Sequence, residues 1–78
     1  MKVISAKYLN EYTIEVTFHD KRKNVINFLP QLKNNPLCKK YLDITQFMKF
    51  KIEQGNIVWG KDWEMIFTPE SLYNNNLN

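Results

Sequence analysis

The sequence predicts an α+β fold, a small two-layer domain in which three strands and a short helix precede three more strands and a second short helix (β3-α-β3-α). Three observations support this order. Apolar and polar residues alternate over residues 12–18, prolines interrupt the strand pattern over residues 30–36, and a capped helix start stands at Thr68. The 78-residue chain makes one domain over residues 1–73, and we expect the polar tail over residues 74–78 to fray.

The first three strands form two hairpins. Residues 3–9 make the first strand, and residues 10–11 make the turn after it. The second strand turns one face toward the core, with the apolar side chains of Tyr12, Ile14, Val16 and Phe18. Residues 19–23 are polar and form a hairpin loop, after which residues 24–28 return as the third strand.

Prolines stop the sheet in the middle of the chain. Pro30 and Pro36 each lack a backbone N–H and push the preceding residue out of helical geometry. After Asn35, which serves as the cap, residues 36–42 form a short helix with three side chains turned inward: Leu37, Cys38 and Tyr41. Residues 43–47 form a local turn.

The second half repeats the order of three strands and a helix. The strands cover residues 48–53, 57–59 and 62–67, with turns at residues 54–56 and 60–61. Phe50 and Ile52 share one face of the first of these strands. The last helix begins after the N-cap Thr68, with Pro69 at its first position and Glu70 near the positive end of the helix dipole.

Cysteine content and the absence of long apolar runs predict a cytoplasmic protein. Cys38 is the single cysteine, so neither an intrachain disulfide nor the paired thiolates of a zinc site can form. The first seven residues lack the apolar core of a secretory signal. No apolar run approaches the roughly 20 residues that span a bilayer, so we expect no membrane partner.

The net charge of +3 is unevenly distributed. Residues 19–51 hold eight basic and two acidic residues, a net charge of +6, whereas the rest of the chain carries −3. Such an asymmetry can orient an anionic partner. Lysines also solubilise loops and sheet edges, so the basic segment has two interpretations, a binding surface and a solvated one.

Five short motifs stand along the chain: Val16-Thr17-Phe18-His19-Asp20, Asn27-Phe28-Leu29-Pro30, Leu42-Asp43-Ile44-Thr45-Gln46-Phe47, Gly55-Asn56-Ile57-Val58-Trp59 and Thr68-Pro69-Glu70-Ser71-Leu72-Tyr73. Together they resemble a family of small bacterial proteins, domain of unknown function 2442, over nearly the whole chain. One departure concerns the first long hairpin, where the family carries Asp-Gly and Lys21 follows Asp20 here.

The resemblance implies a compact α+β fold with no established activity. It also implies a role as the antitoxin partner of a small toxin-like protein encoded by a neighbouring gene, which is suspected of some relatives. It transfers no catalytic or binding residue to this chain. The residues themselves therefore carry the functional interpretation.

The sequence offers no catalytic set, metal site or cofactor loop, so we expect no enzyme activity, metal or cofactor. His19 and Cys38 are the only potential base and thiol, and they belong to a hairpin loop and a separate helix. Asp62, Glu64 and Glu70 are interpreted as solvated carboxylates. Two glycines exclude the glycine-rich phosphate loops.

Aromatic side chains are the main candidates for binding. Trp59 is expected in the core, whereas Trp63, Tyr8 and Tyr73 are candidates for one patch that contacts a small protein partner. The alternative is nucleic-acid binding, in which exposed aromatics stack on bases beside a basic hairpin of three residues: Lys21, Arg22 and Lys23.

Overall fold

The computed structural model describes residues 1–75 as an α+β domain. The first half contains β1 (Val3–Asn10), β2 (Thr13–Phe18), β3 (Lys23–Asn27), α1 (Leu29–Asn34), the 3₁₀ helix η1 (Pro36–Leu42) and α2 (Ile44–Phe47). The second half contains β4 (Lys51–Glu53), β5 (Asn56–Trp59), β6 (Met65–Phe67) and α3 (Pro69–Tyr73). The predicted fold class and the β3-α-β3-α order are confirmed.

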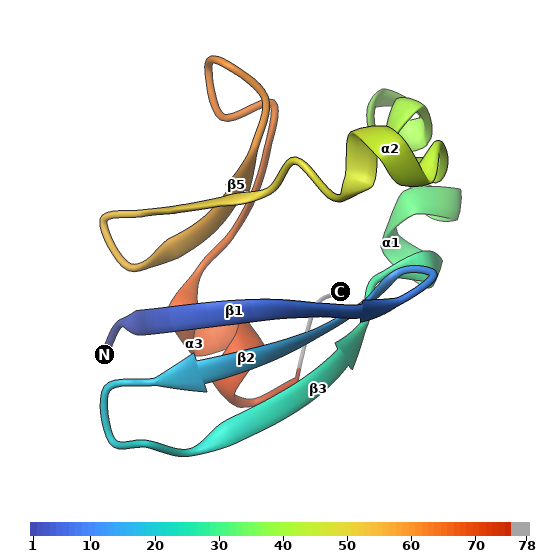
Figure 1. The fold of residues 1–78 in the computed structure, drawn as a ribbon. Coiled ribbons are helices and arrows are strands. Elements are labelled where there is room, and N and C mark those ends of the chain that lie inside the picture. The colour runs from blue at the N-terminus through green and yellow to red at the C-terminus, as the bar shows by residue number, and fades with distance from the viewer. Residues whose placement is uncertain (76–78) are drawn as a thin grey trace.

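Two antiparallel three-stranded sheets form the framework, with strand orders β1-β2-β3 and β4-β5-β6. The helical segments α1, η1 and α2 connect the two sheets at one end, and α3 lies behind the first sheet (Figure 1). The edge strands β1 and β4 lie side by side and meet where the Val3 N–H donates to the Gly55 carbonyl across 3.0 Å. The two sheets therefore join at the start of β1.

The core lies between the sheets and the helices. Ile14, Val16 and Phe18 are fully buried, which confirms the alternation predicted for the second strand. From the second sheet Trp59 is also fully buried, and aromatic side chains surround it at ring-centroid distances of 5.5–6.3 Å: Phe28, Tyr41, Phe47, Phe50 and Phe67. Aromatic side chains thus form the centre of the core around Trp59.

The connection between the sheets is more helical than predicted. We predicted a break at residues 29–32, but Leu29–Asn34 is a helix with Pro30 in its first turn, where a missing N–H costs nothing. The predicted turn at residues 43–47 is helix α2, and the Asp43 carboxylate caps it by accepting from Thr45 N–H at 3.0 Å.

Helix η1 adopts the predicted position, but one of its side chains does not. The side chain of Asn35 caps it, and Cys38 and Tyr41 are buried, as expected. Leu37 is 83% exposed, so its predicted inward orientation is wrong. The 3₁₀ geometry has about three residues per turn, and this spacing places residues 38 and 41 on one face and leaves residue 37 outside it.

Two strands of the second sheet are shorter than predicted. Strand β4 begins at Lys51 rather than residue 48, and β6 begins at Met65 rather than residue 62. Residues 60–64 form a loop in which Gly60 and Trp63 have φ of 86° and 55°. These left-handed conformations end the extended geometry. Asp62 and Glu64 were expected on one face of a strand over residues 62–67, but both lie in the loop before β6.

The last helix begins as predicted and is fastened at its other end. Thr68 caps α3, with its side chain accepting from Ser71 N–H. At the C-terminal end, the Asn24 side-chain amide of β3 donates to the carbonyls of Leu72 at 3.0 Å and Tyr73 at 2.8 Å. Asn74 and Asn75 follow the helix as a turn, and the rest of the predicted tail, residues 76–78, lies outside the described residues.

Candidate functional site

The three aromatic residues predicted to share one patch occupy three different places. Tyr8 lies on β1, and its ring centroid is 6.3 Å from that of Phe47. Tyr73 packs edge-on against Phe18 at 4.9 Å. Trp63 belongs to the β5–β6 loop, where its indole N–H donates to the Glu53 carboxylate across 3.1 Å.

The structure does not bring Trp63, Tyr8 and Tyr73 together. Tyr8 pairs with Ile14 of β2, and Tyr73 packs against Phe18 of the same strand. Ile14 and Phe18 are four residues apart, a distance of about 13 Å along the strand. Trp63 contacts the second sheet through Glu53, whose side chain alternates with that of Ile52 and points to the opposite face. All three side chains are half-buried, and each contacts a different part of the domain.

A different apolar surface lies along β1, β4 and the segment that leads from α2 into β4. We call it the seam and define it by four residues: Tyr8, Met48, Phe50 and Ile52. Phe50 and Tyr8 rest on the buried rings of Trp59 and Phe47, at centroid distances of 6.0 and 6.3 Å. Met48 is 50% exposed and Ile52 is 37% exposed. The seam is therefore a partly exposed apolar layer that covers the buried Phe47 and Trp59 rings.

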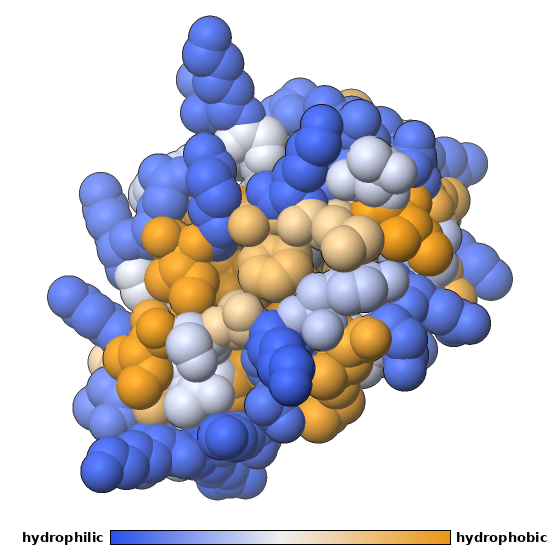
Figure 2. Space-filling model, viewed as in Figure 1, coloured by the Kyte–Doolittle hydropathy of each residue, from blue (hydrophilic) through white to orange (hydrophobic). Residues whose placement is uncertain are grey.

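The space-filling view shows the apolar surface on this side of the molecule. Apolar side chains gather above β1 and below the β4–β5 hairpin and α2, and hydrophilic side chains surround them (Figure 2). Contiguous exposed apolar surface on a small domain is typical of an interaction site. The sequence showed that Phe50 and Ile52 share one face. It did not show how much of that face is exposed to solvent.

Two irregularities protect the free edge of β1. The register between β1 and β2 shifts between Val3 and Ser5 and again between Tyr8 and Asn10. Such bulges increase the local twist and interrupt the straight ladder that another strand would need. The geometry favours contact through the side chains of the seam over addition of a further strand.

The basic hairpin of the nucleic-acid alternative forms the β2–β3 turn. The Phe18 N–H donates to the Arg22 carbonyl at 2.9 Å, the Lys21 N–H donates to the Phe18 carbonyl at 2.8 Å, and Lys21 adopts a φ of 72°. This is a three-residue loop with a left-handed final position, which glycine favours. Lys21, Arg22 and Lys23 are all exposed.

Part of the hairpin charge is already engaged. The Arg22 guanidinium lies 4.7 Å from the centroid of the Tyr73 ring, and the Tyr73 hydroxyl donates to the Asp20 carboxylate at 2.8 Å. The Arg22 N–H and then the Tyr73 hydroxyl hold the pKa of Asp20 below its ordinary value. The arrangement fastens the hairpin to α3.

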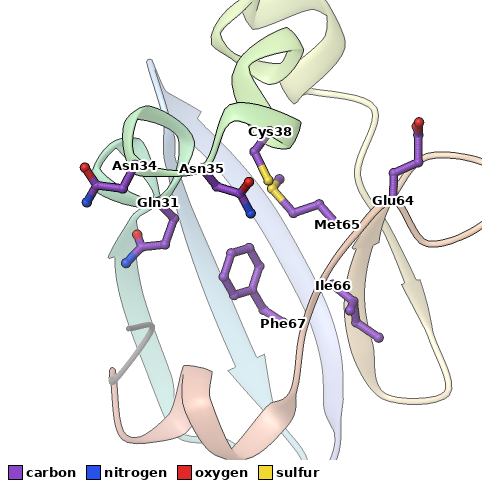
Figure 3. Close-up of a pocket in the computed structure, with 8 residues that line it drawn as sticks. All are labelled: Gln31, Asn34, Asn35, Cys38, Glu64, Met65, Ile66 and Phe67. Atoms are coloured by element: carbon purple, nitrogen blue, oxygen red, sulfur yellow. The ribbon is translucent and has the colours of Figure 1, made fainter.

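The potential thiol and base stay apart. Cys38 points toward Met65 in a pocket of about 420 Å³ between the helical connection and β6, shown in Figure 3. Burial raises the pKa of the Cys38 thiol, which disfavours the nucleophilic thiolate. His19 accepts from the Lys2 N–H through its Nδ1 on the hairpin side of the first sheet. These two residues form no nucleophile–base pair.

The carboxylates named from the sequence also lie in separate places. Glu64 accepts hydrogen bonds from Lys40 and Tyr41, Asp62 is exposed in the β5–β6 loop, and Glu70 occupies the first turn of α3. Within residues 1–75, no three His, Cys, Asp or Glu side chains gather in a way that could hold a metal ion. In the same part of the chain, no helix is long and apolar enough to cross a membrane.

No protein-family model, curated protein or solved structure matches the chain. The resemblance to domain of unknown function 2442 therefore stays a prediction.

Proposed function

We propose that this protein is a non-enzymatic interaction module that binds another small protein through the seam. The observation that carries the proposal is the partly exposed apolar surface over the buried Phe47–Trp59 pair, with Met48 50% and Ile52 37% exposed. A partner that covers Met48 and Ile52 would remove this apolar surface from water, at a gain of about 25 cal/mol per Å².

The kind of partner follows from the shape and composition of the seam. Its two aromatic residues bring large contact areas at a low entropic cost, as anchors at protein interfaces do. The bulged edge of β1 favours a partner that contributes apolar side chains over one that contributes a strand. The family resemblance adds a more specific proposal, an antitoxin-like cytoplasmic protein whose partner is a small toxin-like protein encoded by a neighbouring gene.

Co-expression with the neighbouring gene's product tests the proposal. We expect a complex that co-purifies and that Met48→Glu weakens by at least about 1 kcal/mol, because a charge would be buried against apolar surface. Val25→Glu is the matched control, since Val25 is 57% exposed on the outer face of the first sheet. If no complex forms, or if both variants bind equally well, the seam is not the binding site.

Two further variants distinguish the seam from the aromatic sites predicted from the sequence. Trp63→Ala and Tyr73→Ala remove side chains that lie outside the seam. We expect neither to weaken the complex as Tyr8→Ala does. A larger effect of Trp63→Ala would move the interface to the outer face of the second sheet.

The alternative function, nucleic-acid binding, is supported by three consecutive exposed basic residues on one hairpin: Lys21, Arg22 and Lys23. It predicts a gel shift of labelled oligonucleotides whose affinity falls steeply with salt, by a log–log slope of about 0.7–0.9 per phosphate contact. Replacing the three residues with serine should reduce this slope by roughly 2–3 units. No shift at low salt would remove the alternative.

A further inference from the structure

Four lysines that are distant in sequence surround one shallow pocket of about 450 Å³. Lys40 comes from η1, Lys49 and Lys51 come from the segment that leads into and starts β4, and Lys61 comes from the β5–β6 loop. Tyr41 and Gln46 add a hydroxyl and an amide to the lining. Within β4, Lys51 of the pocket and Ile52 of the seam are consecutive residues, so their side chains point to opposite sides of the strand.

The charge around the pocket is only partly neutralised. Lys40 pairs with Glu64 at 2.9 Å, and Lys51 pairs with Glu53 at 3.3 Å. Lys49 and Lys61 form no ion pair within the part of the chain that the structure describes. Four lysines in the lining, set against Glu64 in the lining and Glu53 beside Lys51, leave a net charge of +2 around the pocket. Positive groups collected in this way repel one another, and a bound anion would relieve the repulsion.

The backbone is shaped to hold Glu64 and Lys40 in place. Glu64 accepts hydrogen bonds from the Lys40 ammonium at 2.9 Å and the Tyr41 hydroxyl at 3.1 Å, and these two donors lower its pKa. Gly60 has a φ of 86°, and a Cβ there would stand 2.9 Å from the Glu64 Cβ, so a larger residue would displace the Glu64 side chain. The Glu64 carboxylate thus holds Lys40 at the wall, whereas Lys49 and Lys61, which form no ion pair within residues 1–75, can turn toward a ligand.

We propose that this pocket binds a compact polyphosphate group, the diphosphate or triphosphate of a nucleotide or the free anion. Its volume falls within the range of small-ligand sites, and ammonium groups bind phosphate oxygens as point charges from several directions. The ring of Tyr41 is only 3% exposed, so no stacking surface for a base is offered there. The phosphates are therefore the part of a ligand that the pocket recognises.

Titration of the ¹⁵N-labelled protein with tripolyphosphate tests the proposal. We expect saturable shifts of the amide signals of Lys49 and Lys61 and their neighbours, with an affinity that falls as salt is added. The double variant Lys49→Ala and Lys61→Ala should weaken binding about tenfold or more, because it removes two charge-assisted contacts. The double variant Lys21→Ala and Lys23→Ala changes the net charge equally but lies on the β2–β3 hairpin, and we expect it to change the affinity less than about twofold.

Several outcomes of this titration would overturn the polyphosphate proposal. Non-saturable shifts, or equal weakening by the two double variants, would show that net charge alone attracts the anion and would overturn the proposal. ATP should bind with the same dependence on the pocket lysines as tripolyphosphate. Binding of ATP without binding of tripolyphosphate, or tighter binding of an oligothymidylate at the same signals, would also overturn it. None of these measurements depends on the protein partner of the seam.

Discussion

The indole N–H of Trp59 donates to the main-chain carbonyl of Phe47 across 2.7 Å inside the core. The bond joins β5 to the last residue of α2, so one side chain fills the centre of the core and also satisfies a buried carbonyl at a helix end. The two rings beneath the seam are held in a fixed relation by this bond.

Trp59→Ala should therefore destabilise the fold by about 3–5 kcal/mol, which is enough to unfold a domain of this size. Trp59→Phe separates the two contributions, since it retains most of the ring volume and leaves the carbonyl without its donor. Denaturant titrations of both variants measure the free energies of unfolding. A loss below about 1 kcal/mol for Trp59→Ala would contradict the central role of this residue.

Asn24→Ala should destabilise the protein by about 1–3 kcal/mol, because its two hydrogen bonds to the end of α3 are partly buried and would be lost together. Asn27→Ala is the comparison, because the Asn27 side chain accepts from Leu29 N–H near the surface. Equal denaturant midpoints for wild-type protein and Asn24→Ala would show that the helix is held by packing alone.

Lys21→Gly should stabilise the protein by up to about 1 kcal/mol, because Lys21 has a φ of 72° that glycine adopts without strain. Lys23→Gly removes the same charge from β3 and should destabilise it, since glycine weakens a strand. Thermal unfolding of the two variants measures the difference. The opposite order would contradict the turn geometry.

Acid should destabilise the protein in part through Asp20. The folded-state pKa of Asp20 is lowered, so its contribution is present above the unfolded pKa and is lost as pH falls through the folded one. Asp20→Asn retains an acceptor for the Arg22 N–H but does not titrate. Its melting temperature should fall less than that of wild-type protein between about pH 5 and pH 2. Parallel curves would exclude this contribution.

Thiol reagents should label Cys38 slowly in the folded protein. The side chain is 5% exposed and burial raises its pKa, so both access and the thiolate fraction are low at neutral pH. Labelling should become fast in denaturant, with Cys38→Ser as the background. Fast labelling of native protein would reopen a chemical role for this residue.

Local signals predicted the elements that depend on neighbours in sequence. The alternation over residues 12–18 placed Ile14, Val16 and Phe18 in the core, and Thr68 and Pro69 began α3 at the predicted residue. Helix α1 was missed because Pro30 was interpreted as a break rather than as a first-turn residue, and α2 was missed because residues 43–47 were interpreted as a turn. A proline is compatible with a break and with the first turn of a helix, and only the burial of Leu32 in the core distinguishes the two.

The sequence by itself determined the α+β class, the order of strands and helices along the chain, and the burial of Trp59. These features depend on the period of apolar residues and on local turn and cap chemistry. Only the tertiary structure decided which surfaces are open. Strands β1 and β4 meet at the seam, and Lys40 and Lys61 both line the pocket, because segments far apart in the chain fold side by side. No local pattern contains that proximity, since it arises when the two sheets pack around one shared core.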